Sequence, residues 1–240
     1  MIEDAKHSPR RAGSRSAFPS RSGVPALAAW IAAAFAFLVF AMLAWSVQRK
    51  EPSPFDTRWL AAFRSAGNPA EPLGPIWLEG TLRDFTALGS YGVLVTFGIV
   101  ALAFLLLTRQ HRRGLVFAVA VSSGMLMNHL MKLALSRPRP EVVDHLISVH
   151  THSFPSGHAM LSMLFYLMLA MVLVRGQATP TVQTLAYAFA ALLAVVVGVT
   201  RVYLGVHWPT DVIAGWAFGL GWALLYWHLD AWLQQAGHGR

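Results

Sequence analysis

Long uninterrupted apolar runs dominate the chain, and polar residues gather in the short segments between them. The first run, residues 26–47, carries no charge and is long enough, at about 1.5 Å per residue, to cross a ~30 Å hydrocarbon core as a helix. It also exceeds the ~7–15 apolar residues of a cleaved signal sequence, so an uncleaved anchor is expected. Five similar runs follow, at residues 91–108, 114–131, 159–174, 181–200 and 212–229. The pattern predicts an all-α bundle of six transmembrane helices.

Two regions depart from this pattern. The run at 159–174 is the shortest, which is compatible with a helix buried in the bundle whose polar end enters the preceding loop. The segment 48–90 contains TRWLAAFRSAG and GPIWLEGTLRDFTAL, which have apolar residues at helical spacing and are separated by NPAEPLGP. We expect two short amphipathic helices here, lying at the membrane interface.

The domain organisation predicted from these runs is simple. Residues 1–23 are rich in Ser, Arg and Pro and have little apolar content, which predicts a disordered basic tail. Residues 24–232 form one six-span membrane domain, and 233–240 form a C-terminal tail. The sequence has no internal repeat of the kind that marks repeat proteins.

Composition supports the membrane interpretation. The chain is 55% hydrophobic and 12% charged, with a mean hydropathy of +0.49, which is too apolar for an ordinary soluble domain. A net charge of +8 is typical of nucleic-acid-binding proteins, but here the basic residues lie at span ends rather than on one soluble face, so no nucleic acid partner is expected. Cysteine is absent, which excludes disulfides and thiolate sites.

The basic residues also predict the orientation of the domain. They cluster before the first run, between the second and third, and after the fourth, at Lys6, Arg10, Arg11, Arg15, Arg21, Arg109, Arg112, Arg113 and Arg175. By the positive-inside rule these segments are cytoplasmic, and with six spans both termini are cytoplasmic too. The segments 48–90, 132–158 and 201–211 then lie together on the opposite, external side.

Reactive side chains gather in two of those external segments, in three clusters. The first is Lys132 followed by LALSRPRP, a compact basic loop that brings Arg137 and Arg139 to a side where the positive-inside rule predicts few cations. The second lies in HTHSFPSGHAM, where Pro-Ser-Gly begins an apolar helix. The free amides and the dipole of a helix start bind anions, and Gly157 allows a ligand to approach closely.

The third cluster lies in TRVYLGVHWPTD, which contains Arg201, His207 and Asp211. Pro209 fits the first position of the sixth helix. Asp211 would then lie about one turn inside, where its carboxylate can fix the tautomer of His207. Each cluster alone is weak, but cations, an anion-binding helix start and two histidines on one membrane face together suit a phosphate.

The order and spacing of these residues resemble the type 2 phosphatidic acid phosphatase superfamily of integral-membrane lipid phosphatases, over residues 91–228. Its first motif, Lys, six residues, Arg-Pro, is met by Lys132 to Arg139 and Pro140, and its second, Pro-Ser-Gly-His, by Pro155 to His158. Its third, Ser-Arg, five residues, His, three residues, Asp, is met at Arg201, His207 and Asp211, with Thr200 in place of the serine.

The resemblance implies a mechanism and a set of roles. His207 would attack phosphorus and form a phosphohistidine, Asp211 would orient it, and His158 would protonate the leaving group. The phosphate oxygens would be held by Lys132, Arg139, Ser156, Gly157 and Arg201. It implies no metal and no cofactor.

The resemblance also implies a lipid phosphate substrate and a bacterial inner membrane, with the site on the periplasmic face. Undecaprenyl diphosphate is favoured over phosphatidic acid, phosphatidylglycerophosphate and lipid A phosphates, the last including phosphotransfer. The roles of His150, His152 and Arg137 and the oligomeric state stay open: Arg137 joins the site or meets lipid headgroups. The same residues could also form a lipid-phosphate carrier, an intramembrane serine protease using Ser156, or a zinc site at His150, His152 and His158.

Overall fold

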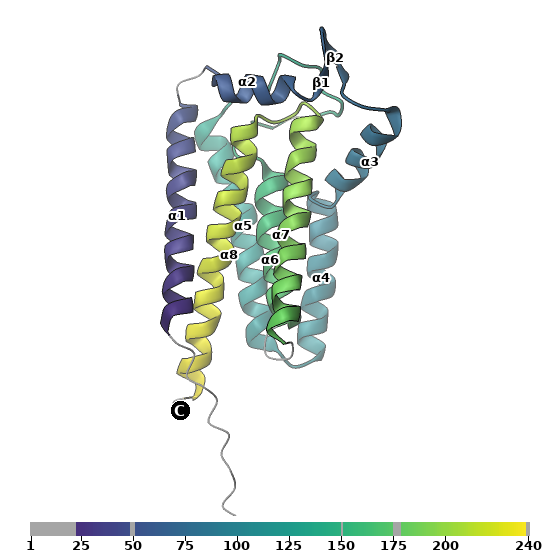
Figure 1. Cartoon of the computed structure of the whole chain (residues 1–240). Helices are drawn as coiled ribbons and strands as arrows, with labels where there is room; N and C mark the ends of the chain where they lie inside the picture. Colours follow the sequence, from purple (N-terminus) through teal and green to yellow (C-terminus); the bar gives the residue numbers. More distant parts are fainter. Residues whose placement is uncertain (1–22, 49–50, 150, 175–178, 239–240) are drawn as a thin grey trace, which may run out of the picture.

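The computed structural model describes residues 23–48, 51–149, 151–174 and 179–238, and these form a helical bundle (Figure 1). The basic tail, Arg175 and His150 lie outside the described residues, apart from Gly23, which begins the first helix. In chain order the helices that follow the apolar runs are α1 (Gly23–Val47), α4 (Tyr91–Leu107), α5 (His111–Leu135), α6 (Gly157–Val174), α7 (Pro180–Tyr203) and α8 (Pro209–His238). Each predicted run therefore has its helix, and α8 continues into the predicted C-terminal tail.

The number of membrane spans differs from the simple prediction of six. Five of the described helices, α1, α5, α6, α7 and α8, are individually long and apolar enough to cross a membrane. The shorter α4 qualifies only together with the helix before it, α3 (Ile76–Ala87), from which it is bent by 46°. The described part of the chain thus has five candidate spans, or six when this bent pair is counted as one.

The segment before α4 is only partly the predicted pair of interfacial helices. It contains α2 (Pro54–Ala61), a short antiparallel hairpin of β1 (Arg64–Ser65) and β2 (Asn68–Pro72), and then α3. The first predicted helix therefore ends early, because the chain turns back at Gly67, which has a φ of +83° that glycine adopts easily. Figure 1 shows α2 lying across one end of the bundle.

The short helix α6 is the centre of the bundle, as its length had indicated. In its apolar window 72% of residues are buried inside the protein, against 11% for α1 at the periphery. It packs most extensively against α8 and α7, and α1 packs mainly against α8. Because α6 is enclosed by protein, it needs no lipid-facing surface, and its first turn is held at a defined place within the bundle.

The three polar segments meet at one end of the bundle, as predicted. Arg64 donates to the carbonyl oxygens of Tyr203 and Asp144, and the amide of Leu146 donates to the carbonyl oxygen of Leu204. At the opposite end, Arg112 near the start of α5 pairs with Asp230 of α8. The motif-bearing loops are therefore separated from the α4–α5 connection by the length of the bundle (Figure 1).

Candidate active site

His207 and Asp211 form a buried pair where α7 passes into α8. Helix α8 begins at Pro209, as the sequence predicted, and this places Asp211 in its first turn. The Oδ2 atom of Asp211 accepts a hydrogen bond of 3.0 Å from the backbone amide of Trp208 and lies 3.4 Å from Nδ1 of His207. The carboxylate thus caps its own helix and faces one edge of the imidazole ring.

Ser153 completes this contact, although it belongs to none of the three sequence motifs. Its hydroxyl donates a hydrogen bond of 2.5 Å to Oδ2 of Asp211, and its Oγ lies 3.4 Å from Nδ1 of His207. Ser153 is fully buried. The hydroxyl is therefore within reach of both members of the pair and can accept from an Nδ1–H while it donates to the carboxylate.

The other edge of the His207 ring faces cations. Nη1 of Arg139 lies 3.3 Å from Nε2, and the same guanidinium is held by the carbonyl oxygens of Val206 and Thr151. Burial lowers the pKa of His207 well below its usual range, and the positive charges of Arg139, Arg201 and Lys132 lower it further. The imidazole is therefore neutral at physiological pH, so one of its nitrogens keeps a lone pair.

Two helix C-termini supply the other predicted cations. Lys132, in the last turn of α5, donates from Nζ to the carbonyl oxygen of His152 at 2.6 Å. Arg201, in the last turn of α7, is buried and donates from Nη1 to Thr86 Oγ1 at 2.9 Å. Its Nε has no hydrogen-bond partner within the described residues. The negative ends of the helix dipoles favour cations at both positions.

The start of α6 enters the same cluster. The backbone amide of Ser156 donates to the carbonyl oxygen of Asp211 at 3.0 Å, which ties this turn to the start of α8. The Ser156 hydroxyl is fully buried and has no partner among the described residues. At Gly157 a Cβ atom would lie 2.9 Å from Oδ1 of Asn128, so a side chain there meets the neighbouring helix. His158 follows and is half-buried.

All the residues predicted for the site therefore belong to one cluster. The motifs predict catalytic roles at His207, His158 and Asp211 and phosphate contacts at Lys132, Arg139, Ser156, Gly157 and Arg201. Four of these, Arg139, Arg201, Lys132 and His158, influence the pKa of His207 electrostatically. Ser156 and Gly157 are joined to His207 through Asp211. Within the described residues, unpaired donors at Ser156 and Arg201 are available to an anion.

Arg137 joins the site, which was the first of its two interpretations, through a contact with the Asp211 carboxylate. It is buried, and its Nη1 donates to Oδ1 of Asp211 at 2.5 Å. Its Nη2 donates to Oδ2 of Asp56 at 2.8 Å, and its guanidinium lies 5.4 Å from the centre of the Trp208 ring. Arg137 thus lies behind the Asp211 carboxylate rather than in the lipid headgroup region.

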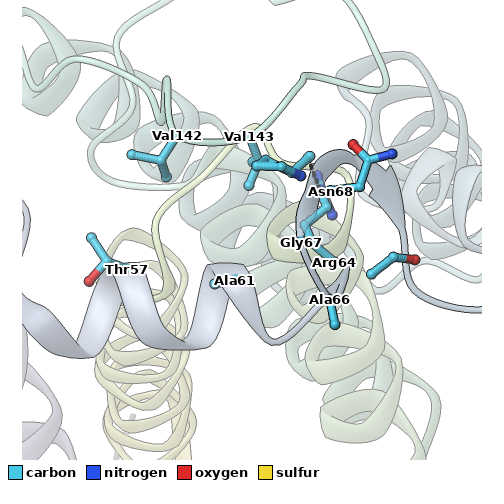
Figure 2. Close-up of a pocket in the computed structure, with 10 residues that line it drawn as sticks. Thr57, Ala61, Arg64, Ala66, Gly67, Asn68, Val142 and Val143 are labelled. Atoms are coloured by element: carbon cyan, nitrogen blue, oxygen red, sulfur yellow. Dashed lines mark hydrogen bonds between the residues drawn. The ribbon is translucent and has the colours of Figure 1, made fainter.

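The segment 51–90 contributes three buried polar side chains that the sequence patterns did not indicate: Asp56, Arg64 and Thr86. Arg64 packs against the loop before His207 and donates to the carbonyl oxygen of Tyr203. In this loop Gly205 has a φ of +77°, and a Cβ atom there would lie 2.7 Å from Nη2 of Arg64. Arg64 begins β1 of the hairpin and lines a pocket of about 470 Å³ together with Val142 and Val143 (Figure 2). Its guanidinium is occupied by backbone carbonyl oxygens, which gives it a structural role.

The zinc hypothesis involved His150, which lies outside the described residues. Its second histidine, His152, is exposed, and its carbonyl oxygen accepts the bond from Lys132. Among the residues that the structure describes, no group of three or more His, Asp or Glu side chains is arranged to hold a metal ion. The described side chains around His207 are instead mainly donors and cations.

Several known proteins are similar to this chain in sequence and in structure. The family model of the PAP2 superfamily matches residues 113–235, which contain all three polar clusters. The phosphatidylglycerophosphatase B of Bacillus subtilis (strain 168) is 32% identical over 145 residues, which cover 60% of this chain and 71% of the relative. The crystal structure of a transmembrane PAP2-type phosphatidylglycerolphosphate phosphatase from Bacillus subtilis superposes with a TM-score of 0.71 at 28% identity, covering 83% of this chain and 96% of that one.

Two further relatives carry different names. A lipid A 1-phosphatase of Rhizobium johnstonii is 38% identical over 122 residues, covering 46% of this chain and 44% of the relative. An undecaprenyl-diphosphatase of Sulfolobus acidocaldarius is 27% identical over 137 residues, covering 55% of this chain and 62% of the relative. This chain therefore corresponds to less than two thirds of either protein. The names of the relatives specify different lipids, but each describes a phosphatase.

Proposed function

This chain belongs to the PAP2 superfamily, and from that premise we propose that it removes phosphate from a membrane lipid with His207 as the nucleophile. The observation that carries the proposal is the environment of one ring. Nδ1 of His207 faces the Asp211 carboxylate and the Ser153 hydroxyl, while Nε2 faces the Arg139 guanidinium. A proton on Nδ1 leaves the lone pair on Nε2, directed at the place where cations would hold a phosphate.

In the first step Nε2 of His207 attacks phosphorus, and the bond from phosphorus to the leaving oxygen breaks. His158 gives its proton to that oxygen, which leaves as a lipid alcohol or, from a diphosphate, as a lipid monophosphate. The imidazole becomes a positively charged phosphohistidine whose Nδ1–H is stabilised by Asp211. His158 follows Gly157 at the start of α6 and is half-buried.

In the second step water attacks the phosphohistidine, and the bond from phosphorus to nitrogen breaks. The now neutral His158 accepts the proton from water, inorganic phosphate leaves, and His207 returns to its neutral form. The proton taken up by His158 is the one it gives away in the next turnover, so the cycle balances.

Transition-state charge would be stabilised by the cations and donors of the cluster. Lys132, Arg139 and Arg201 lie close enough to affect the pKa of His207, so they are also close enough to neutralise charge on its phosphoryl group. The Ser156 hydroxyl and Arg201 Nε have no partner among the described residues and would bind phosphate oxygens. Because these groups neutralise the phosphate themselves, we propose that the reaction needs no metal ion.

The substrate we would test first is phosphatidylglycerophosphate. The motifs alone favoured undecaprenyl diphosphate, but the phosphatidylglycerophosphatase B relative matches more of its own length than does the undecaprenyl-diphosphatase relative, 71% against 62%. The match to the solved phosphatidylglycerolphosphate phosphatase of Bacillus subtilis covers 96% of that protein's chain. Undecaprenyl diphosphate stays the second candidate, because the described cluster suits a phosphate group, which both lipids carry.

We propose six membrane crossings, with α3 and α4 as one bent span, and both termini in the cytoplasm of a bacterial cell. The segment that joins α4 to α5 and begins α5 carries Arg109, Arg112 and Arg113, and it lies at the end of the bundle opposite the start of α8 (Figure 1), which supports an external site under the positive-inside rule. A reporter enzyme fused after Arg240 should be active only in its cytoplasmic form, and one inserted at Gly67 only in its external form. The reverse pattern would contradict this orientation.

The activity is tested by phosphate release from the purified chain in detergent. Phosphatidylglycerophosphate, undecaprenyl diphosphate, phosphatidic acid and lipid A are each supplied with and without EDTA, and His207→Gln is compared with His111→Gln. His111 is exposed at the start of α5, so its variant controls for the loss of an imidazole elsewhere. We expect release that persists in EDTA, is lost in His207→Gln and is kept in His111→Gln.

Three contrary results would each point to a different function or mechanism. Lipid binding without release, retained in His207→Gln, would support a carrier. Release abolished by EDTA would contradict the metal-independent mechanism. Activity that survives in His207→Gln but disappears in Ser156→Ala would support a serine nucleophile instead.

A further inference from the structure

Asp56, a residue outside the three motifs, is connected to the active site by an unbroken series of buried polar contacts. Its Oδ2 accepts a hydrogen bond of 2.8 Å from Nη2 of Arg137, and Nη1 of Arg137 donates to Oδ1 of Asp211 at 2.5 Å. The other carboxylate oxygen of Asp211 faces His207. We propose that Asp56 is a positioning residue that acts on the His207 nucleophile through Arg137 and Asp211, an inference that rests on the proposed function.

The same carboxylate also fixes the start of α8. Oδ1 of Asp56 accepts the backbone amide of Thr210 at 2.9 Å, and Oδ2 accepts the Thr210 hydroxyl at 2.9 Å. Thr210 directly precedes Asp211, so these bonds hold the first turn of α8 in register with α2. The Thr210 hydroxyl lies 2.8 Å from Nη1 of Arg137, which closes a ring of contacts among three elements of the fold.

Burial makes the charge balance of this group important. The side chains of Asp56, Arg137 and Asp211 are 1%, 8% and 0% exposed, so solvent screens their charges weakly. Two carboxylates and one guanidinium carry one net negative charge. Without Asp56, the positive charge of Arg137 would cancel the negative charge of Asp211. The only uncompensated charges near His207 would then be those of its cationic neighbours.

The charged and titratable groups that face His207 come from every neighbouring segment. They are Lys132 of α5, Arg139 of the following loop, His158 of α6, Arg201 of α7 and Asp211 of α8. All except Asp211 favour the neutral imidazole. The negative charge behind Asp211 therefore opposes these cations and would stabilise the positive phosphohistidine formed during the reaction.

Asp56 also lies on a helix whose other face is apolar. In α2, Phe55 and Trp59 are 45% and 51% exposed and border an apolar groove with residues of α7 and α8, whereas Asp56 and Leu60 are buried. Ser53 accepts the Asp56 amide and caps the helix. The position of α2 on the bundle thus determines the position of the Asp56 carboxylate.

This role predicts the direction of a pH shift. Asp56→Asn keeps the size of the side chain and an oxygen that can accept the Thr210 amide, but removes one negative charge. The pKa of His207 should then fall, and the acid limb of kcat/KM should move to lower pH. If Asp56→Asn acted only by loosening the packing around His207, water would reach the imidazole and raise its pKa toward the ordinary value. The acid limb would then move to higher pH.

The experiment compares wild type, Asp56→Asn and Asp84→Asn, all as full chains, with the best lipid substrate. Asp84 is an exposed carboxylate in α3 and controls for the loss of charge from the same segment. We expect Asp56→Asn to lower kcat about tenfold, with KM changed less than about twofold and the limb shifted to lower pH. Asp84→Asn should behave as wild type.

A double-mutant cycle tests the route through Arg137. The losses in kcat for Asp56→Asn and Arg137→Gln should not add, so the double variant should be about as slow as Arg137→Gln alone. Additive losses, an unchanged kcat in Asp56→Asn, or a limb shifted to higher pH would each overturn the role of Asp56. Absence of release by wild type would instead overturn the proposed function, and this inference with it.

Discussion

Nη1 of Arg139 lies 3.3 Å from Nε2 of His207, on the edge of the ring that faces away from Asp211. A cation at this distance from the nitrogen that we propose as the nucleophile disfavours its protonation before substrate binds. It is also close enough to contact a phosphoryl group attached to the same nitrogen. Under the proposed mechanism one guanidinium therefore contacts His207 in both the free enzyme and the phosphohistidine form.

The first prediction concerns the acid limb of kcat/KM, which reports groups of the free enzyme. Under the proposed mechanism only neutral His207 can attack, and because burial and then Arg139 lower its pKa, activity should persist below pH ~6.5, the ordinary value for histidine. Arg139→Gln removes a cation and should raise that pKa, so its limb should lie at higher pH than that of wild type. Measuring both with one substrate cancels the ionisation of the phosphate itself.

Arg139→Gln should also lower kcat/KM by about a hundredfold, because a charge-assisted contact to phosphate is lost. Arg58→Gln is the matched control, since Arg58 is an exposed arginine on α2. A limb that stays in place or moves to lower pH in Arg139→Gln would contradict the electrostatic role of this residue.

Ser153→Ala should slow the reaction without unfolding the protein. The variant removes the hydroxyl that donates to Oδ2 of Asp211, and a buried charged acceptor that loses such a partner costs about 1.5–3 kcal/mol. We expect kcat to fall about tenfold or more. Ser162→Ala is the control, because that buried hydroxyl donates to the backbone of its own helix, at Ala159. Equal effects of the two substitutions would show that Ser153 contributes to packing and that its hydrogen bond to Asp211 does not affect the rate.

Gly157→Ala should impair phosphate binding. The added methyl group would lie 2.9 Å from Oδ1 of Asn128, so the first turn of α6 or the buried Asn128 must move. We expect KM to rise by about tenfold or more, since the anion-binding amides shift with the turn. Gly92→Ala, where a Cβ atom meets nothing within 4 Å, should have the kinetics of wild type. Isothermal titration with inorganic phosphate gives an independent measure of the binding loss.

Thr86→Val should weaken the hold on Arg201. The Thr86 hydroxyl accepts the hydrogen bond from Nη1, and valine leaves this buried guanidinium with one fewer partner. We expect kcat/KM to fall about three- to tenfold, since one hydrogen bond is worth about 1 kcal/mol. Thr81→Val should be neutral, because the Thr81 hydroxyl donates to a carbonyl oxygen of its own helix. An unaffected Thr86→Val would mean that Arg201 is positioned by its own helix.

The positions of the main helices and of the motif residues could be predicted from the sequence because the signals are local. An apolar run has the length of a span, and Pro209 or Gly157 marks the start of a helix within a few residues. Once the spans are placed, the motifs at their ends are brought to the same side of the membrane. The pairing of His207 with Asp211 followed from a separation of one helical turn.

The contributions of segment 51–90 could not be predicted in this way. Asp56 contacts Thr210, 154 positions away, and Thr86 contacts Arg201, 115 positions away. In the sequence Asp56 looks like any acidic residue in the first turn of a helix, and Thr86 like any polar residue of an amphipathic one. Only the packed arrangement of the segment on the bundle distinguishes them.

The hairpin and the bent span were missed for a different reason. Segment 64–72 lacks the alternation of a typical strand, and it contains two prolines, which are rare inside strands. Helix α3 was interpreted as separate from α4 because its polar residues suit an interface, yet it joins α4 at a bend of 46°. Hydropathy measures each stretch alone and carries no information on the angle at which two adjoining helices meet.

The contrast between the enclosed α6 and the peripheral α1 has a consequence for how this chain can diverge. In α1 most apolar side chains face outward, so exchange among Leu, Ile and Val at those exposed positions changes little, whereas Phe37 and Phe40 pack against the rings of Phe218 and Phe154. In α6 nearly every position is a neighbour of another helix, and a change of volume is transmitted to the turn that carries Ser156 and His158. Substitutions should therefore accumulate faster in the peripheral α1 than in the enclosed α6. Mutant libraries that seek a new lipid specificity are best directed at α1.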